Sequence, residues 1–153
     1  FQSELNFNDR TDGWSYNQNA VIDGSFEMNP DLEWGPKLEF NLNKELIDSG
    51  YVFLNLNYEY EGPIDSSGLF VLTINNSSHQ IHWEGKDLNS SQYSYLSEEK
   101  ILVSNRFRIK TDLLNINPAD NYLFQLYYWN SLKKTIVLDH IAVSLSNQKI
   151  HVY

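Results

Sequence analysis

Aromatic side chains that alternate with polar ones are the residues of this chain best suited to contact a ligand. Trp129 shares a strand face with Tyr127 and Gln125, and Trp83 shares a face with His79, because strand side chains alternate with period two. Flat aromatic rings stack on the C–H faces of sugars, and amide or imidazole groups hydrogen-bond sugar hydroxyls. We therefore predict that these five residues form a glycan-binding surface, provided that the two strands lie in one sheet.

Two alternatives remain open for the aromatic residues. In the first, Trp83 and Trp129 fill the core of the fold and bind nothing. In the second, ligand binds at the loop edge of the fold, where the candidate residues are Trp14, Tyr16, Trp34 and Arg10.

Residues arranged for catalysis are sparse. The chain has no cysteine, which excludes thiol catalysis and disulfides. His79 and His82 are three apart on a predicted strand, so they point to opposite faces and cannot bind one metal ion. No zinc-protease, esterase, P-loop or dinucleotide-binding motif occurs. We predict that the chain is not an enzyme, and a glycoside hydrolase or lyase is the least favoured alternative.

The stretch Asn121 to Leu145 predicts a C-terminal hairpin of two long strands joined by a short polar turn. In its second arm Asp139 has the same parity as Val137 and Ile141, so it is expected to lie among apolar neighbours. A buried carboxylate needs a partner, because an unpaired buried charge costs several kcal/mol.

Alternating apolar runs predict the remaining strands, and the longest run, Val52 to Tyr60, predicts a central strand. Residues 85–99 are expected to form a long loop, residues 44–49 a helical turn, and residues 111–120 a crossover loop. About nine or ten strands with almost no helix indicate one all-β domain over residues 1–153, a two-sheet antiparallel β-sandwich of jelly-roll type. An immunoglobulin-like sandwich is the alternative.

The charge balance excludes several partners. The chain carries 11 Lys and Arg against 20 Asp and Glu, and its net charge of −9 argues against nucleic acid and anionic lipid. No apolar run reaches the roughly 18 residues that span a bilayer, so we predict no membrane insertion of this domain. The chain begins at Phe1, and we expect it to be a mature or excised part of a longer exported or membrane-bound parent. Its 14% aromatic and 20% charged residues favour an extracellular, periplasmic or cell-surface location.

Two segments carry a resemblance to a known family. They are residues 69–84 and 121–145, which read in the order strand, Trp, polar loop, strand and terminal hairpin. In the hairpin, Tyr127-Tyr128-Trp129-Asn130 is followed by Ile136-Val137-Leu138-Asp139. This arrangement resembles the galactose-binding-domain-like jelly rolls, which include carbohydrate-binding modules and accessory domains of bacterial glycan-handling surface proteins. The resemblance implies a non-catalytic carbohydrate-binding module that works beside other domains of its parent. The alternative is a structural or protein-interaction domain without a small-molecule site.

The resemblance also implies a structural calcium ion that ties the first strand to the last. Asp139 matches the acidic ligand of the final strand, and Asn8 or Asp9 falls at the N-terminal ligand position. The carbonyl ligands of an early loop would come from Asp23 to Glu27, and Glu27 is counted among the metal-binding residues. The alternative for Asp139 is that it accepts hydrogen bonds from backbone amides or caps a turn.

Overall fold

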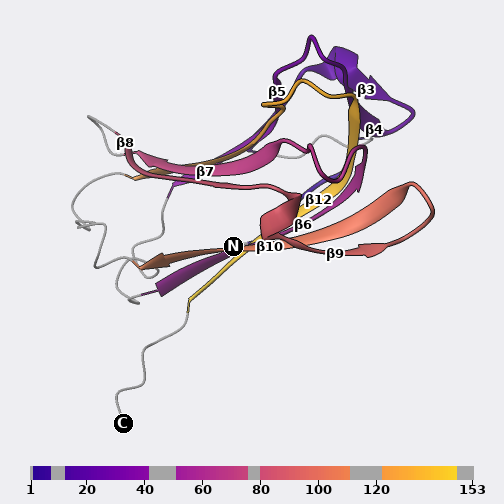
Figure 1. The fold of residues 1–153 in the computed structure, drawn as a ribbon. Coiled ribbons are helices and arrows are strands. Elements are labelled where there is room, and N and C mark those ends of the chain that lie inside the picture. The colour runs from indigo at the N-terminus through magenta and orange to yellow at the C-terminus, as the bar shows by residue number, and fades with distance from the viewer. Residues whose placement is uncertain (1, 8–12, 42–50, 76–79, 111–121, 148–153) are drawn as a thin grey trace.

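The computed structural model describes residues 2–7, 13–41, 51–75, 80–110 and 122–147, which form two packed antiparallel sheets (Figure 1). The larger sheet has the order β3-β4-β12-β6-β10-β9, with β1 also paired to β12, and the smaller has the order β2-β5-β11-β7-β8. The strands are β1 Gln2–Leu5, β2 Trp14–Ser15, β3 Val21–Ile22, β4 Ser25–Met28, β5 Trp34–Asn41, β6 Tyr51–Glu61, β7 Leu69–Asn75, β8 Gln80–Lys86, β9 Gln92–Tyr95, β10 Lys100–Lys110, β11 Leu123–Trp129 and β12 Ile136–Asn147. The predicted two-sheet antiparallel β-sandwich is confirmed.

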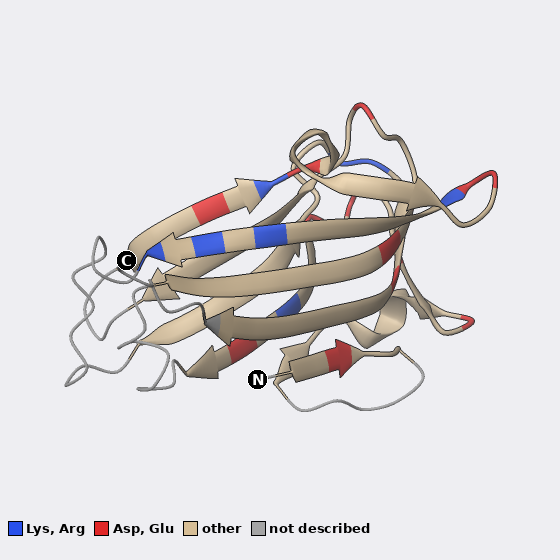
Figure 2. Ribbon diagram, turned by 90° about the horizontal axis from the view of Figure 1, so that it is seen from below, with Lys and Arg blue, Asp and Glu red and all other residues tan. Residues whose placement is uncertain are grey.

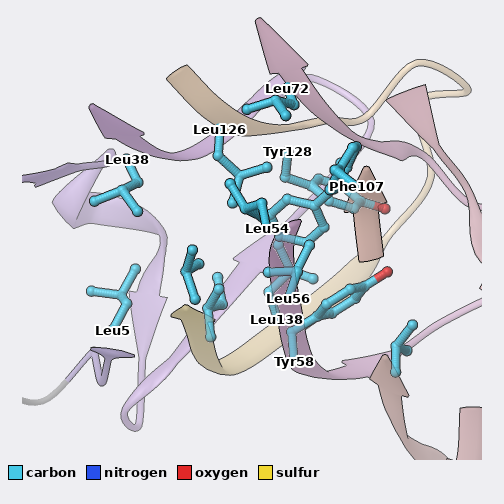
Figure 3. Close-up of a cluster of buried hydrophobic side chains, with 14 of the residues drawn as sticks. Leu5, Leu38, Leu54, Leu56, Tyr58, Leu72, Phe107, Leu126, Tyr128 and Leu138 are labelled. Atoms are coloured by element: carbon cyan, nitrogen blue, oxygen red, sulfur yellow. The ribbon is translucent and has the colours of Figure 1, made fainter. Parts of the chain in front are cut away.

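Period-two alternation builds the core between the sheets. In β6 every second residue is buried, from Val52 to Tyr60, and the strand lies between β12 and β10 as predicted for a central strand. Figure 3 shows Leu54, Leu56 and Tyr58 of β6 facing Leu126 and Tyr128 of β11 across the interior. Each such side chain contributes about 1.5–3 kcal/mol when fully buried.

The predicted C-terminal hairpin is wrong. β11 pairs with β5 and β7, whereas β12 pairs with β1, β4 and β6, so the two strands belong to different sheets. The buried Asn130 directs the crossing, because its Nδ2 donates to the carbonyls of Leu32 and Lys134 at 3.1 and 2.8 Å. Its Oδ1 accepts from the Lys134 amide at 3.1 Å. The alternation therefore identified both strands but not their partners.

The predicted long loop at residues 85–99 is also wrong in most of its length. β8 continues to Lys86, a 3-10 turn, η2, covers Leu88–Ser90, and β9 then pairs with β10. Asp87 caps the turn, since its Oδ1 accepts from the Ser90 amide at 3.0 Å. The predicted helical turn at 44–49 and the predicted crossover loop at 111–120 lie outside the described residues.

A β-bulge in β12 changes the expected surroundings of Asp139. Asp139 is opposite Glu59 and Ala142 is opposite Asn57, so two residues of β12 occupy the space of one on β6. His140, in the bulge, has a φ of 44°. Leu138 before the bulge and Ile141 after it both point into the core, although they are three residues apart. Asp139 therefore does not share a face with Ile141. Among the described residues, no helix is long and apolar enough to span a bilayer.

Candidate functional site

The predicted aromatic and polar residues that the structure describes meet on the outer face of the five-stranded sheet. The register places Glu39, Gln125, Thr73 and Trp83 in one row across β5, β11, β7 and β8. Tyr127 and Trp129 are two and four residues beyond Gln125, so they share its face. The condition set by the sequence, that both strands lie in one sheet, is met, with β7 between them.

Trp34 joins this face and does not belong to a separate loop-edge site. Its ring stacks on that of Trp129 with centroids 5.8 Å apart and planes 15° apart, and it meets Tyr127 edge-on at 5.8 Å. Trp129 Nε1 donates to Glu33 Oε1 at 3.2 Å, which holds the Trp129 ring of the stack in place. Trp34 remains 54% exposed. We call Trp34, Trp83, Tyr127 and Trp129 the aromatic platform.

Trp83 lies at the far side of the platform and is 48% exposed. A Cβ atom at Gly85 would sit 3.0 Å from Trp83 Cη2 and 3.2 Å from Leu69 Cδ1, so the indole extends along its own strand toward Gly85. The absence of a side chain at Gly85 gives the ring room to rest on the sheet. The alternative that Trp83 and Trp129 fill the core is therefore wrong.

A polar network occupies the centre of the same face. Gln125 Nε2 donates to Glu39 Oε1 at 3.0 Å, and Gln125 Oε1 accepts from Thr73 Oγ1 and Asn75 Nδ2, each at 3.2 Å. Lys37 Nζ lies 2.7 Å from Glu39 Oε1. The hydrogen bond from Lys37, followed by that from Gln125, lowers the pKa of the Glu39 carboxyl below its ordinary value. The amide of Gln125 is thus held in one orientation beside the tryptophans.

An open cleft of about 580 Å³ adjoins the platform. Its walls combine aromatic rings with groups that donate and accept hydrogen bonds, and they include Tyr16, Asn17, Trp34, Lys37, Gln125 and Tyr127. Clefts of this size and mixed lining are typical of small-ligand sites.

The other loop-edge candidates have structural roles where they are described. Tyr16 packs edge-on against Phe7 and Phe26, with centroids 5.2 and 6.1 Å away, and Trp14 Nε1 donates to Ser3 Oγ at 2.9 Å. Arg10 and the predicted site residue His79 lie outside the described residues.

The residues predicted to bind calcium are only partly described. Asp139 is buried and accepts hydrogen bonds from Ser25 Oγ and from the His140 amide, both at 2.9 Å. Glu27 is exposed on β4, opposite Val137. Asn8 and Asp9 lie outside the described residues. Calcium binding stays a prediction, and a backbone amide is already one partner of Asp139.

Sequence reasoning placed Trp34 in a separate loop-edge site and missed Gly85. The glycine two residues after Trp83 is a usable signal, because the two positions share a strand face and a residue without a side chain leaves room beside the indole. Trp34 could not be assigned in this way, since a register shift separates Tyr127 from Trp129 and brings Trp34 opposite Trp129.

No protein-family model and no curated protein matches this chain. Among solved structures it is similar to CBM27-1 of Caldicellulosiruptor saccharolyticus, a carbohydrate-binding module crystallised in complex with mannohexaose. The two chains are 14% identical, the match covers 93% of this chain and 96% of that chain, and the TM-score is 0.40. The two-sheet sandwich is the architecture that the sequence resemblance implied.

Proposed function

We propose that this chain is a non-catalytic carbohydrate-binding module and that the aromatic platform holds the glycan. The observation that carries the proposal is the pair of half-exposed tryptophans, Trp34 and Trp83, on either side of the Gln125 network on one sheet face. Large aromatic rings left in water forgo the free energy of burial, and grouped exposed rings mark binding surfaces.

The chemistry of the face suits neutral sugars. Sugar rings would stack on the open faces of Trp34 and Trp83, and their hydroxyls would bond Gln125, Lys37 and Glu39 between them. Gln125 and Glu39 are already oriented by the network, so little ordering is required on binding. Figure 2 shows acidic and basic residues at scattered positions along the strands.

A glycan-array screen of the purified domain tests the proposal, followed by calorimetric titration of each hit. We expect Trp34→Ala and Trp83→Ala each to lower affinity about tenfold, which corresponds to about 1.4 kcal/mol. Tyr95→Ala is the matched control, because Tyr95 is an exposed aromatic residue on β9 of the other sheet. It should leave affinity unchanged.

A blank array from a well-folded sample would contradict the proposal and favour a structural or protein-interaction domain. Equal losses in the Trp34 and Tyr95 variants would show that glycan binds elsewhere.

We also propose the setting in which the module acts. It would belong to a longer bacterial glycan-handling protein that is extracellular, periplasmic or at the cell surface. The low charged fraction, 20%, and the aromatic content, 14%, support this setting. Fractionation of cells that produce the parent protein tests it, and a cytosolic parent would contradict it.

A further inference from the structure

Two carboxylates face each other on the outer face of the seven-stranded sheet. Asp139 of β12 is directly opposite Glu59 of β6, and the two side chains are only 12% and 17% exposed. Like charges at opposite positions of a strand pair are destabilising, and limited exposure reduces screening by water. Within the described ranges, no Lys or Arg forms an ion pair with either carboxylate. A positive charge held between the two carboxylates would relieve this repulsion.

The bulge supplies a third donor at the same point. His140 Nε2 lies 3.4 Å from Glu59 Oε2 and 3.9 Å from Asp139 Oδ1, and the three donor atoms lie within 4.8 Å of one another. Both imidazole distances exceed the roughly 2.8 Å of a charge-assisted hydrogen bond. Ligands about 2.1 Å from a tetrahedral metal ion are about 3.4 Å apart. The distances from His140 Nε2 to the two carboxylate oxygens therefore suit ligands of one metal ion better than partners in a hydrogen bond.

Neighbouring groups orient the most buried donor. Ser25 Oγ donates to Asp139 Oδ2 at 2.9 Å, and the His140 amide donates to Asp139 Oδ1 at 2.9 Å. Such outer contacts hold metal ligands in position in known sites. The His140 side chain is exposed, so an ion can reach the cluster from solvent.

We propose that Glu59, Asp139 and His140 bind a divalent transition-metal ion of the zinc class, with water completing its coordination. An imidazole ligand suits zinc and its neighbours, whereas calcium takes oxygen ligands in larger number. This site shares only Asp139 with the predicted calcium site. It lies on the opposite sheet from the aromatic platform and does not depend on the glycan proposal. Its structural effect is to link β6 to β12 at the bulge.

Calorimetric titration of the metal-stripped domain with zinc chloride, and separately with calcium chloride, tests the site. We expect one zinc ion to bind, and Glu59→Gln and His140→Asn each to lower zinc affinity at least about tenfold. Asparagine is chosen because it tolerates the left-handed backbone at His140. His82→Asn is the matched control, since His82 Nε2 lies 3.5 Å from Glu84 Oε2 without a second carboxylate in its group. It should bind zinc like the parent.

Thermal unfolding of the same proteins gives a second readout. Zinc should raise the melting midpoint of the parent and of His82→Asn, but not that of Glu59→Gln or His140→Asn. The proposal is overturned by an absence of zinc binding, by unchanged affinity in both cluster variants, or by tighter binding of calcium than of zinc at these residues. Loss of zinc binding in the His82 variant alone would place the ion elsewhere and overturn it too.

Discussion

Replacing Gly68 with alanine should destabilise the sandwich for a steric reason that the structure makes explicit. Gly68 is buried beside the start of β7, and a Cβ there would lie 2.3 Å from the Trp129 carbonyl oxygen and 2.9 Å from the Tyr128 hydroxyl. Contacts below 3.0 Å require movement, so the Gly68 and Trp129 backbones must separate by about 0.7 Å. Leu69 and Trp129 are paired, and the separation therefore opens the β7–β11 ladder at the platform.

The expected magnitude combines three effects. Overpacking costs about 1–3 kcal/mol, and loosening the 3.1 Å hydrogen bond from the Gly68 amide to Tyr128 Oη adds about 1 kcal/mol. The φ of Gly68 is not in the left-handed region, so alanine gains about 0.4–1 kcal/mol from a less flexible unfolded chain. We expect a net loss of about 2 kcal/mol in the free energy of unfolding, measured by urea denaturation, and a fall of roughly 4–8 °C in the melting midpoint.

Tyr128→Phe separates the steric effect from the hydrogen bond. It removes the hydroxyl but adds no atom at position 68, and it should cost about 1–2 kcal/mol because the Gly68 amide is left buried without its partner. A Gly68→Ala protein within about 0.5 kcal/mol of the parent would refute the steric reasoning. A double variant no less stable than Tyr128→Phe would show that the methyl group meets no resistance from the Trp129 carbonyl.

Three further predictions concern other features. Asn130→Ala should lower the free energy of unfolding, measured by urea denaturation, by about 3 kcal/mol or more. The reason is that the Leu32 carbonyl and the Lys134 carbonyl and amide lose their hydrogen-bond partner. A loss below about 1 kcal/mol would contradict this role of Asn130. Burial raises the pKa of the Tyr58, Tyr60 and Tyr128 hydroxyls above 10.0, so their contribution to stability is complete below pH 10 and is lost as the pH rises further. Part of the phenolate absorbance of the ten tyrosines should therefore appear only together with loss of circular dichroism, and complete phenolate absorbance before that loss would contradict the prediction. Gly85→Val should displace the Trp83 indole and weaken binding of any platform glycan about tenfold in calorimetry, and unchanged affinity would show that the ring position is not used.

Local patterns were enough to identify most of the strands, though not β9, whereas pairing partners depended on contacts distant in sequence. The inward face of β6 followed from alternation alone, because every second residue from Val52 is apolar. The partners of β11 did not, since a short polar connection fits both a hairpin and a crossing between sheets. The difference is made by Asn130, whose bonds to Leu32 are visible only in three dimensions.

The candidate sites show the same limit. Period two placed Gln125, Tyr127 and Trp129 on one face, as the structure has them. The pairing of Asp139 with Glu59 could not be predicted. A bulge has no reliable sequence signal, and every residue after it points to the opposite face from the one that alternation predicts. Trp34 was likewise assigned to another site until the irregular register of β5 and β11 was known.

The crossing between β11 and β12 also determines when the molecule can fold. β11 is the middle strand of its sheet, and β12 joins β1, β4 and β6, yet both strands come from the last 31 residues of the chain. During synthesis β5 and β7 therefore have no strand between them until residues 123–129 emerge. Both sheets can be completed only after residues 123–147 have emerged, and until then the earlier strands keep unpaired edges that favour aggregation. A ribosome-bound chain that stops before residue 123 is accordingly expected to be protease-sensitive throughout, with neither sheet assembled.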